Sequence, residues 1–228
     1  MLTKLDRLPT QSSLTELAHH TIKRYILEGN FDSESRLTED FFAQRLGISK
    51  SPVREALNTL QSEGLLRIEP RKGTYLRRYS AKEIEDLYQL REALEVFAAG
   101  AVKITPKLIR ELTDSVTRIV QFLERNEKPL YIDEDIHFHE TIVAGTGNSE
   151  LCRMHSNIQT KLWLCRCQTY PLTALDTPAS HSQITEALRK GDRALAQEVT
   201  RKHIHLVRDT LLRTLSETAP ASNSIPWQ

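Results

Sequence analysis

The chain has 228 residues, of which 39% are hydrophobic and 27% charged, and its net charge at pH 7 is +1. This length is enough for two small domains with separate cores, and the charge balance excludes a chain that is basic throughout. Three cysteines do not make a disulfide framework, and the apolar run VFAAGAV at 96–102 is too short to span a bilayer. The start, MLTKLDRLPTQSS, lacks the apolar core of a signal peptide, so we expect a cytoplasmic protein with no membrane partner.

The first predicted domain, residues 13–78, contains three helices followed by two strands. Apolar residues at helical spacing predict helices within 14–30, 37–47 and 49–64, and strand-like runs follow at 65–69 and 74–79. The helix boundaries rest on Thr38 and on Ser49 or Ser51 as N-caps, on Pro52 in a first turn, and on Gly29-Asn30, Gly47 and Gly64 as stops. This order of elements predicts a winged helix-turn-helix.

The second predicted domain, residues 80–216, is helical throughout. Its periodic segments fall at about 80–103, 106–125, 129–145, 149–169, 180–190 and 192–216, separated by proline and glycine. No sheet is indicated, so the fold class is mainly α: an N-terminal winged helix-turn-helix and a C-terminal all-α bundle.

Basic residues are concentrated at the end of the first domain. Residues 45–78 hold eight Lys or Arg and three acidic residues, whereas residues 80–228 hold 18 basic and 20 acidic residues. The second helix of a helix-turn-helix offers its N-terminal residues to the major groove, and a wing adds charge near the minor groove. The predicted DNA contacts are Ser49, Lys50, Ser51, Pro52 and Arg54, with Arg71, Lys72 and Gly73 in the wing. The alternative is that these charges only solvate a helix and a turn.

A buried carboxylate is predicted in the segment PLYIDEDIHFHETIVAG. At 100° per residue, Asp135 and His139 fall in the middle of its apolar face, whereas Asp133 and His137 fall on the polar side. An unpaired buried carboxylate is costly, so another group must lie against Asp135.

Two further histidines are predicted to face inward. His203 lies in the apolar stripe of the last helix, and His181 precedes Ile184 and Leu188 at helical spacing, while His205 lies on the polar side. One carboxylate and three imidazoles form a ligand set for Zn²⁺ or a similar divalent ion. The predicted metal ligands are therefore Asp135, His139, His181 and His203. The alternative is a group of core histidines that are hydrogen-bonded to Asp135 and to backbone carbonyls.

Arg91 lies within the predicted core face of the first helix of this domain, which consists of Leu87, Leu90, Leu94, Phe97 and Ala98. A buried guanidinium is a bidentate partner for a carboxylate, so Arg91 is the predicted contact for an acidic ligand. An ion pair with Glu95, four residues on, is the alternative. Trp163 and Tyr170 could line the same pocket or belong to the core, and Cys165 and Cys167 are expected to be free thiols.

Two stretches of the chain resemble known families. LTEDFFAQRLGISKSPVREALNTLQSEGLLRIEPRKGTYL is similar to the DNA-binding half of GntR-family bacterial transcription regulators, although Lys50 stands where that family more often has Arg. Residues 80–216 resemble the FCD domain of the FadR-like subgroup, and the match includes Asp135, His139, His181 and His203. The resemblance implies a dimer that binds a short inverted-repeat operator, with Arg54 on a guanine, and a metal that holds a small organic acid.

Three functional hypotheses follow. The first is a DNA-binding transcription regulator, a homodimeric repressor for example, whose operator affinity is controlled by a carboxylate bound at the metal. The second is a regulator that responds to the metal alone. The third, a metalloenzyme with a basic accessory module, lacks any catalytic motif such as H-E-x-x-H, so we expect no enzyme activity.

Overall fold

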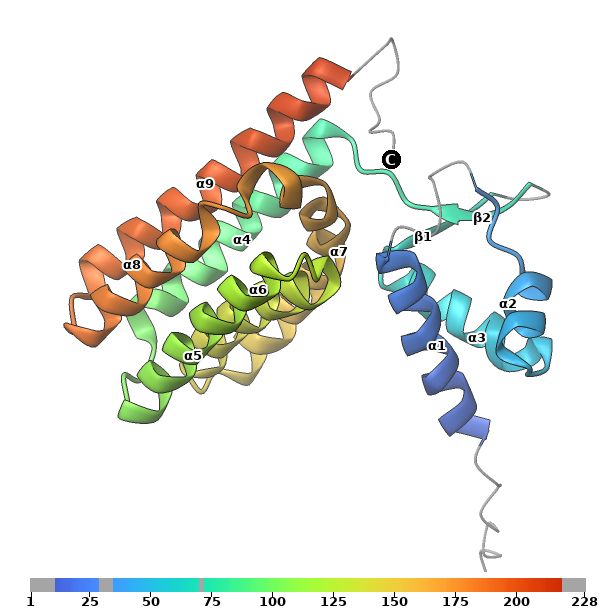
Figure 1. Cartoon of the computed structure of the whole chain (residues 1–228), viewed down its shortest axis with the longest axis horizontal. Coiled ribbons are helices and arrows are strands. Elements are labelled where there is room, and N and C mark those ends of the chain that lie inside the picture. The colour runs from blue at the N-terminus through green and yellow to red at the C-terminus, as the bar shows by residue number, and fades with distance from the viewer. Residues whose placement is uncertain (1–10, 29–34, 70–71, 219–228) are drawn as a thin grey trace, which may run out of the picture. The chain divides into compact units, whose positions relative to one another are not determined.

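The computed structural model describes residues 11–28, 35–69 and 72–218, and these form two compact units that divide between Arg77 and Arg78 (Figure 1). The predicted wing residue Arg71 lies outside the described residues. The fold class is confirmed: one unit has three helices and a two-stranded wing, and the other is entirely helical in its described part.

The described part of the first unit contains α1 (Gln11–Leu27), α2 (Glu39–Leu46) and α3 (Lys50–Ser62). Helices α1 and α2 both pack against α3. Thr38 caps α2 as predicted, because its hydroxyl accepts a hydrogen bond of 3.1 Å from the Phe41 N–H. Gly47 ends α2 in the left-handed conformation, with φ of 67°. These two ends fix the turn between α2 and α3 and thereby the direction in which α3 starts.

The wing is an antiparallel pair, β1 (Leu66–Glu69) and β2 (Gly73–Leu76), with Leu66 opposite Leu76. Both of these leucines are buried, so the wing is attached to the core of the unit through one apolar end. An isolated bridge between Leu37 and Thr74 ties the wing to the segment that precedes α2. A two-stranded ribbon is marginal by itself, and these contacts supply its support.

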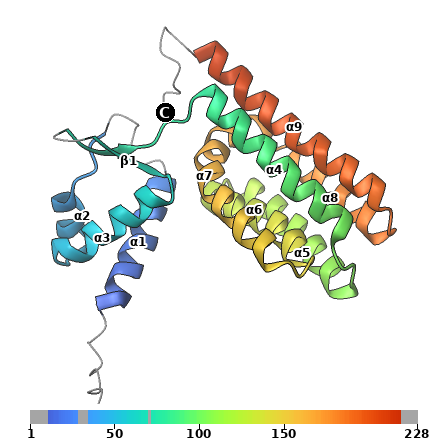
Figure 2. The same ribbon diagram turned by 180° about the vertical axis from the view of Figure 1, so that it is seen from behind.

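The second unit consists of α4 (Ala81–Ala101), α5 (Pro106–Glu124), α6 (Lys128–Ala144), α7 (Ser149–Thr173), α8 (Thr177–Arg189) and α9 (Arg193–Thr218). Helix α4 packs against α6, α7 and α9, and α8 packs against α5 and α9. Figures 1 and 2 show α4 alongside α9 from both sides. Helix α4 therefore contributes side chains to the interior of the unit, where the polar groups described below lie close together.

The buried face of α4 differs from the one predicted. Arg91, Leu94 and Ala98 are buried as predicted. Leu90 and Phe97 were expected beside them but are 38% and 55% exposed, whereas Tyr88 and Glu95 are buried. The prediction followed the apolar residues, but the buried stripe of α4 has a charged pair at its centre. No helix in the described part of the chain is long and apolar enough to cross a membrane.

Candidate functional site

The exposed end of α3 carries the predicted DNA contacts. Lys50, Ser51 and Arg54 are exposed on its first turns, as is Ser49 just before it. Pro52 differs from the prediction: its side chain is buried, so it fixes the start of the helix and is not free to reach a base. In the wing, Lys72 is exposed and Gly73 is half-buried with φ of 133°, a conformation that favours glycine.

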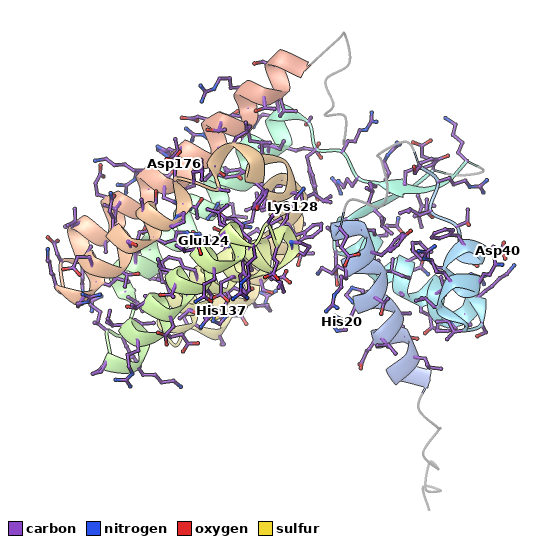
Figure 3. All side chains as sticks on the ribbon, viewed as in Figure 1. His20, Asp40, Glu124, Lys128, His137 and Asp176 are labelled. Atoms are coloured by element: carbon purple, nitrogen blue, oxygen red, sulfur yellow. The ribbon has the colours of Figure 1, made fainter. Side chains whose placement is uncertain are left out.

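Both cations at the start of α3 are paired with acids of α2. Arg54 donates two hydrogen bonds to Glu39, of 2.7 and 2.8 Å, and Lys50 pairs with Asp40, which is labelled on α2 in Figure 3. The hydrogen bond from Arg54 lowers the pKa of Glu39. The guanidinium fork that would read a guanine is thus held by a carboxylate when no DNA is present.

In the second unit the four predicted ligands come together. Asp135 and His139 lie one turn apart on α6, His181 is on α8 and His203 is on α9. One donor atom from each lies within 4.8 Å of all the others, and all four residues are buried. The rings of His139, His181 and His203 have centroids 4.9 to 5.2 Å apart, and Phe138 stacks on His181 at 3.9 Å. Three helices therefore direct these four polar side chains into one small volume.

Two of these imidazoles have no hydrogen-bond partner among the described residues. Neither ring nitrogen of His181 or of His203 is bonded, and Nε2 of His181 stays 3.5 Å from Oδ1 of Asp135. A buried polar group without a partner costs about 1–3 kcal/mol, so each such group requires an explanation. This observation disfavours the alternative of core histidines satisfied by Asp135 and the backbone. A metal ion would engage these nitrogens, and the residues fit that role.

The protonation states suit metal binding. Burial lowers the pKa of His139 and of His181, and it lowers the pKa of His203 to about 3, so all three rings are neutral near pH 7. Burial alone would raise the pKa of Asp135, but Arg166 and the neighbouring imidazoles outweigh it, and the pKa lies below its usual value. Neutral imidazoles and an ionised carboxylate are the forms that bind a divalent ion without first losing a proton.

Arg166 on α7 is the partner of Asp135 that the sequence did not reveal. Its Nε donates a hydrogen bond of 2.6 Å to Oδ2 of Asp135, and another of its nitrogens donates to Gln159. This contact leaves Oδ1 of Asp135 facing the histidines. The need for a partner was predicted from burial, but its identity depends on how α6 and α7 pack.

Arg91 takes part in a second buried network. Its Nε donates to Glu95 at 3.0 Å, and its Nη2 lies 2.9 Å from Nε2 of His139. Oε1 of Glu95 also lies 2.9 Å from Nε2 of His155 and accepts a hydrogen bond of 3.0 Å from Nε2 of Gln159. Oε2 of Glu95 lies 2.9 Å from Nδ1 of His139. The predicted alternative, an Arg91–Glu95 pair, therefore exists within a network that also includes a candidate metal ligand.

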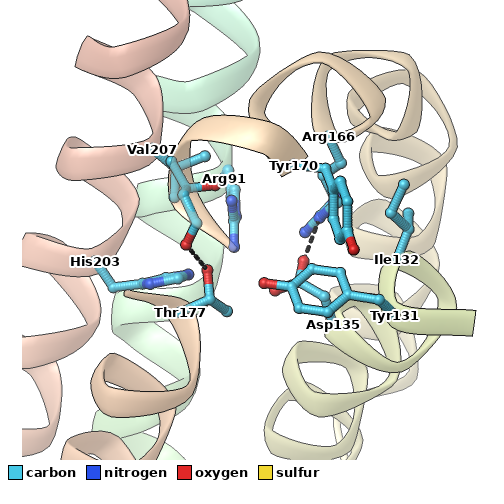
Figure 4. Close-up of a pocket in the computed structure, with 10 residues that line it drawn as sticks. Arg91, Tyr131, Ile132, Asp135, Arg166, Tyr170, Thr177, His203 and Val207 are labelled. Carbon is cyan, nitrogen blue, oxygen red and sulfur yellow. Dashed lines mark hydrogen bonds and ion pairs between the residues drawn. The ribbon is translucent and has the colours of Figure 1, made fainter. Parts of the chain in front are cut away.

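A small cavity adjoins these groups. Figure 4 shows Arg91 between His203 on one side and Asp135 with Arg166 on the other. The cavity has a volume of about 20 Å³, room for a water molecule, and Tyr131, Tyr170, Thr173 and Thr177 also line it. Tyr170 thus lines the cavity, whereas Trp163 is buried outside this wall. Two guanidinium groups therefore lie beside the carboxylate of Asp135 and the ring of His203 in the wall of this cavity.

The remaining polar residues of the sequence analysis lie elsewhere. Asp133 is exposed, and His137, labelled in Figure 3, has an ion-pair contact of 3.4 Å with Glu111 on α5. His205 pairs with Glu92 at 2.8 Å on the partly exposed side of α9. Among the described residues neither Cys165 nor Cys167 forms a disulfide, as expected.

Family comparisons agree with this division. Residues 14–76 match the bacterial regulatory proteins of the gntR family, and residues 86–206 match the FCD domain. An HTH-type transcriptional regulator from the TAR-I ttuE-ttuC′ intergenic region of Agrobacterium vitis is 36% identical over 132 residues, which are 56% of this chain and 77% of the relative. The HTH-type regulator YdhC of Bacillus subtilis is 27% identical over 94% of this chain and 96% of its own. The gluconate operon repressor of Bacillus subtilis is 31% identical over 61% of this chain and 58% of its own.

Solved structures share the fold. The chain aligns with McbR/YncC of E. coli with a TM-score of 0.76 and 20% identity, over 88% of this chain and 98% of the other. A GntR regulator from Rhodococcus sp. RHA1 gives a TM-score of 0.79 and 19% identity, over 89% and 99% of the two chains. The families and relatives are transcriptional regulators and not enzymes. The chain is thus a GntR-family transcriptional regulator with a DNA-binding winged helix-turn-helix and a C-terminal FCD domain.

Proposed function

We propose that this regulator binds a divalent metal ion in its helical domain, that the ion and Arg91 together bind a small organic acid, and that the acid controls the affinity for an operator. The observation that carries the proposal is the set of buried, unpartnered nitrogens of His181 and His203 beside Asp135 and His139. Such a set of donors is costly without an ion and is the ligand type of Zn²⁺.

The acidic nature of the ligand is inferred from the charges around the cavity. Arg91 and Arg166 both line it, and a metal ion would add two positive charges, which only Asp135 and Glu95 offset. A carboxylate would reduce this excess of positive charge and could accept both ends of a guanidinium fork. The name of the gluconate operon repressor is consistent with an acid as a signal, because gluconate is a carboxylate. Because the cavity has room for little more than one water molecule, an organic acid can bind only if side chains in the cavity wall move.

We further propose that residues 13–78 bind DNA and that residues 80–216 bind the ligand and form a homodimer. Ser49, Lys50, Ser51 and Arg54 would contact the major groove, and Arg71, Lys72 and Gly73 the minor groove. Large apolar side chains remain exposed on α4 and α9, which pack together: Leu90, Phe97 and Leu206. Exposed apolar side chains that lie together suit a surface that a second copy covers, and this supports the homodimer.

DNA binding and its control are tested together by fluorescence anisotropy on duplexes from the region upstream of the protein's own gene. The expected result is selective, salt-sensitive binding to one duplex, which EDTA changes and which an organic acid changes only when Zn²⁺ is present. An effect of metal without any acid effect would support the metal-responsive alternative. Binding that ignores both would contradict the proposal.

A further inference from the structure

Arg91 and a metal ion would both use the lone pair on Nε2 of His139. Nε2 of His139 is the ring nitrogen nearer the cluster, 3.9 Å from Oδ1 of Asp135, while Nδ1 lies against the carboxylate of Glu95. The negative charge of that carboxylate, 2.9 Å away, favours the proton of the neutral ring on Nδ1, so Nε2 keeps its lone pair. Arg91 has only N–H donors, so its contact of 2.9 Å with Nε2 uses that lone pair.

We propose that Arg91 is a metal-displaced gate: it occupies His139 in the metal-free protein, and the ion releases it to bind the acid. This inference rests on the proposed function and adds an order of events to it. A nitrogen that ligates an ion cannot at the same time accept a hydrogen bond in the same direction, so Nη2 of Arg91 must leave Nε2 when the ion binds.

The network around Glu95 determines which part of Arg91 can move. Nε of Arg91 remains bonded to Glu95, and Glu95 is itself held by His155 and Gln159 of α7. The stem and the Nε end of the guanidinium are thereby anchored, and only the Nη2 end loses its partner. Arg91 already lines the cavity, so the freed N–H groups are available there to a carboxylate without a new rotamer for the whole side chain.

The consequence is cooperative binding of ion and acid. The ion creates an unpaired buried N–H on Arg91, and the acid satisfies it, so each raises the affinity for the other by the same factor. Without the acid, the ion must bind against the hydrogen bond that it breaks. Metal alone is then held more weakly than the four ligands permit.

The test is isothermal titration calorimetry with Zn²⁺ in buffers of equal ionic strength that contain either acetate or chloride. Acetate serves as the simplest carboxylate and a weak chelator. For the wild type we expect acetate to tighten Zn²⁺ binding by a factor of about 5 to 100, the usual range of coupling between sites. For Arg91→Met we expect Zn²⁺ in chloride to bind about tenfold or more tightly than to the wild type, because the competing hydrogen bond is absent, and we expect the acetate effect to disappear.

Charge and folding are controlled with two further proteins. Arg91→Met alone also removes a positive charge. Arg91→Lys keeps that charge, but its side chain is one bond shorter and loses the Nη2 contact with His139, so it must show a gain in Zn²⁺ affinity as well. Arg118→Met removes an arginine that binds Glu134 through two hydrogen bonds of 2.8 Å outside this network, and it must behave like the wild type. Circular dichroism and thermal melting establish that each variant is folded, and Arg91→Lys is the protein to use if Arg91→Met is not.

The outcomes separate this inference from the proposed function. The gate is overturned, and the metal site left standing, if Arg91→Met and Arg91→Lys bind Zn²⁺ no more tightly than the wild type. The same holds if the acetate effect persists in Arg91→Met. A wild type in which acetate has no effect on Zn²⁺ affinity also overturns it. Absence of Zn²⁺ binding in every protein overturns the metal-dependent function itself.

Discussion

The two units use charge in opposite ways. In the winged helix, Arg54 and Lys50 are exposed and are paired with acids only at the surface, where solvent weakens the attraction. In the helical unit, Arg91, Arg166, Glu95 and Asp135 are at most 7% exposed and bonded to one another. Surface pairs exchange partners readily and suit a DNA reader. Buried pairs resist change, so a ligand that rearranges them can alter the whole domain.

The largest effect expected from this difference is the loss of a buried partner. Arg166→Met leaves Asp135 as a buried carboxylate without its closest cation, and we expect a loss of about 3–5 kcal/mol in the free energy of unfolding of the metal-free protein. Chemical denaturation in EDTA measures it. Arg153→Met, which breaks the exposed pair with Glu150, is the control and should cause no measurable change. Equal effects in both variants would remove the contrast between buried and exposed ion pairs on which this comparison rests.

Acid should destabilise the helical unit through its histidines. The pKa of His203 is about 3 in the folded protein and about 6.5 when unfolded, so the unfolded chain binds more protons below pH 6.5. This stability is fully present above that pH and is lost as the pH falls. In EDTA, His203→Gln should reduce the slope of unfolding free energy between pH 6.5 and 5 by about 1.4 kcal/mol per pH unit. An unchanged slope would show that His203 is not buried as a neutral ring.

Within the winged helix, substitutions of Arg54 and of Lys72 should weaken DNA binding in different ways. Arg54→Ala should weaken operator binding about 10- to 100-fold and relax the preference at one base pair, because a bidentate contact to guanine is lost. Lys72→Ala should weaken all duplexes alike and reduce the salt dependence by about one ion. Anisotropy titrations at several salt concentrations, on operator and on single-base variants, distinguish the two. Uniform weakening by Arg54→Ala would assign it to a phosphate.

The smallest effect is expected at Glu39, which holds Arg54 in the free protein. Glu39→Gln removes a weak exposed ion pair, so operator and unrelated DNA should both bind about two- to fivefold more tightly. Glu16→Gln, at an exposed position of α1, is the matched control for the loss of one negative charge. Weaker binding of Glu39→Gln to the operator alone would mean that Glu39 orients Arg54 for its base.

How much the sequence could predict also differs between the units. In the winged helix, local signals such as Thr38 and Gly47 define the helix ends, and the predicted order of elements is confirmed. In the helical unit, Asp135 and His139 could be placed on one buried face because they are four residues apart. Arg166, His155 and Gln159 could not be found, because their role depends on which helix packs opposite α6 and α4. Leu90 and Phe97 were misplaced because hydrophobicity does not reveal a buried stripe with charged residues at its centre.

The metal content of the purified protein tests the central claim most directly. Native mass spectrometry with elemental analysis, after dialysis against Zn²⁺ and removal of the excess, should show one ion per chain in the wild type. His181→Ala and His203→Ala should reduce the affinity more than about 100-fold and retain none, since a lost ligand should cost more than the 10- to 100-fold of a lost supporting residue. A wild type without metal, or variants that keep it, would contradict the account.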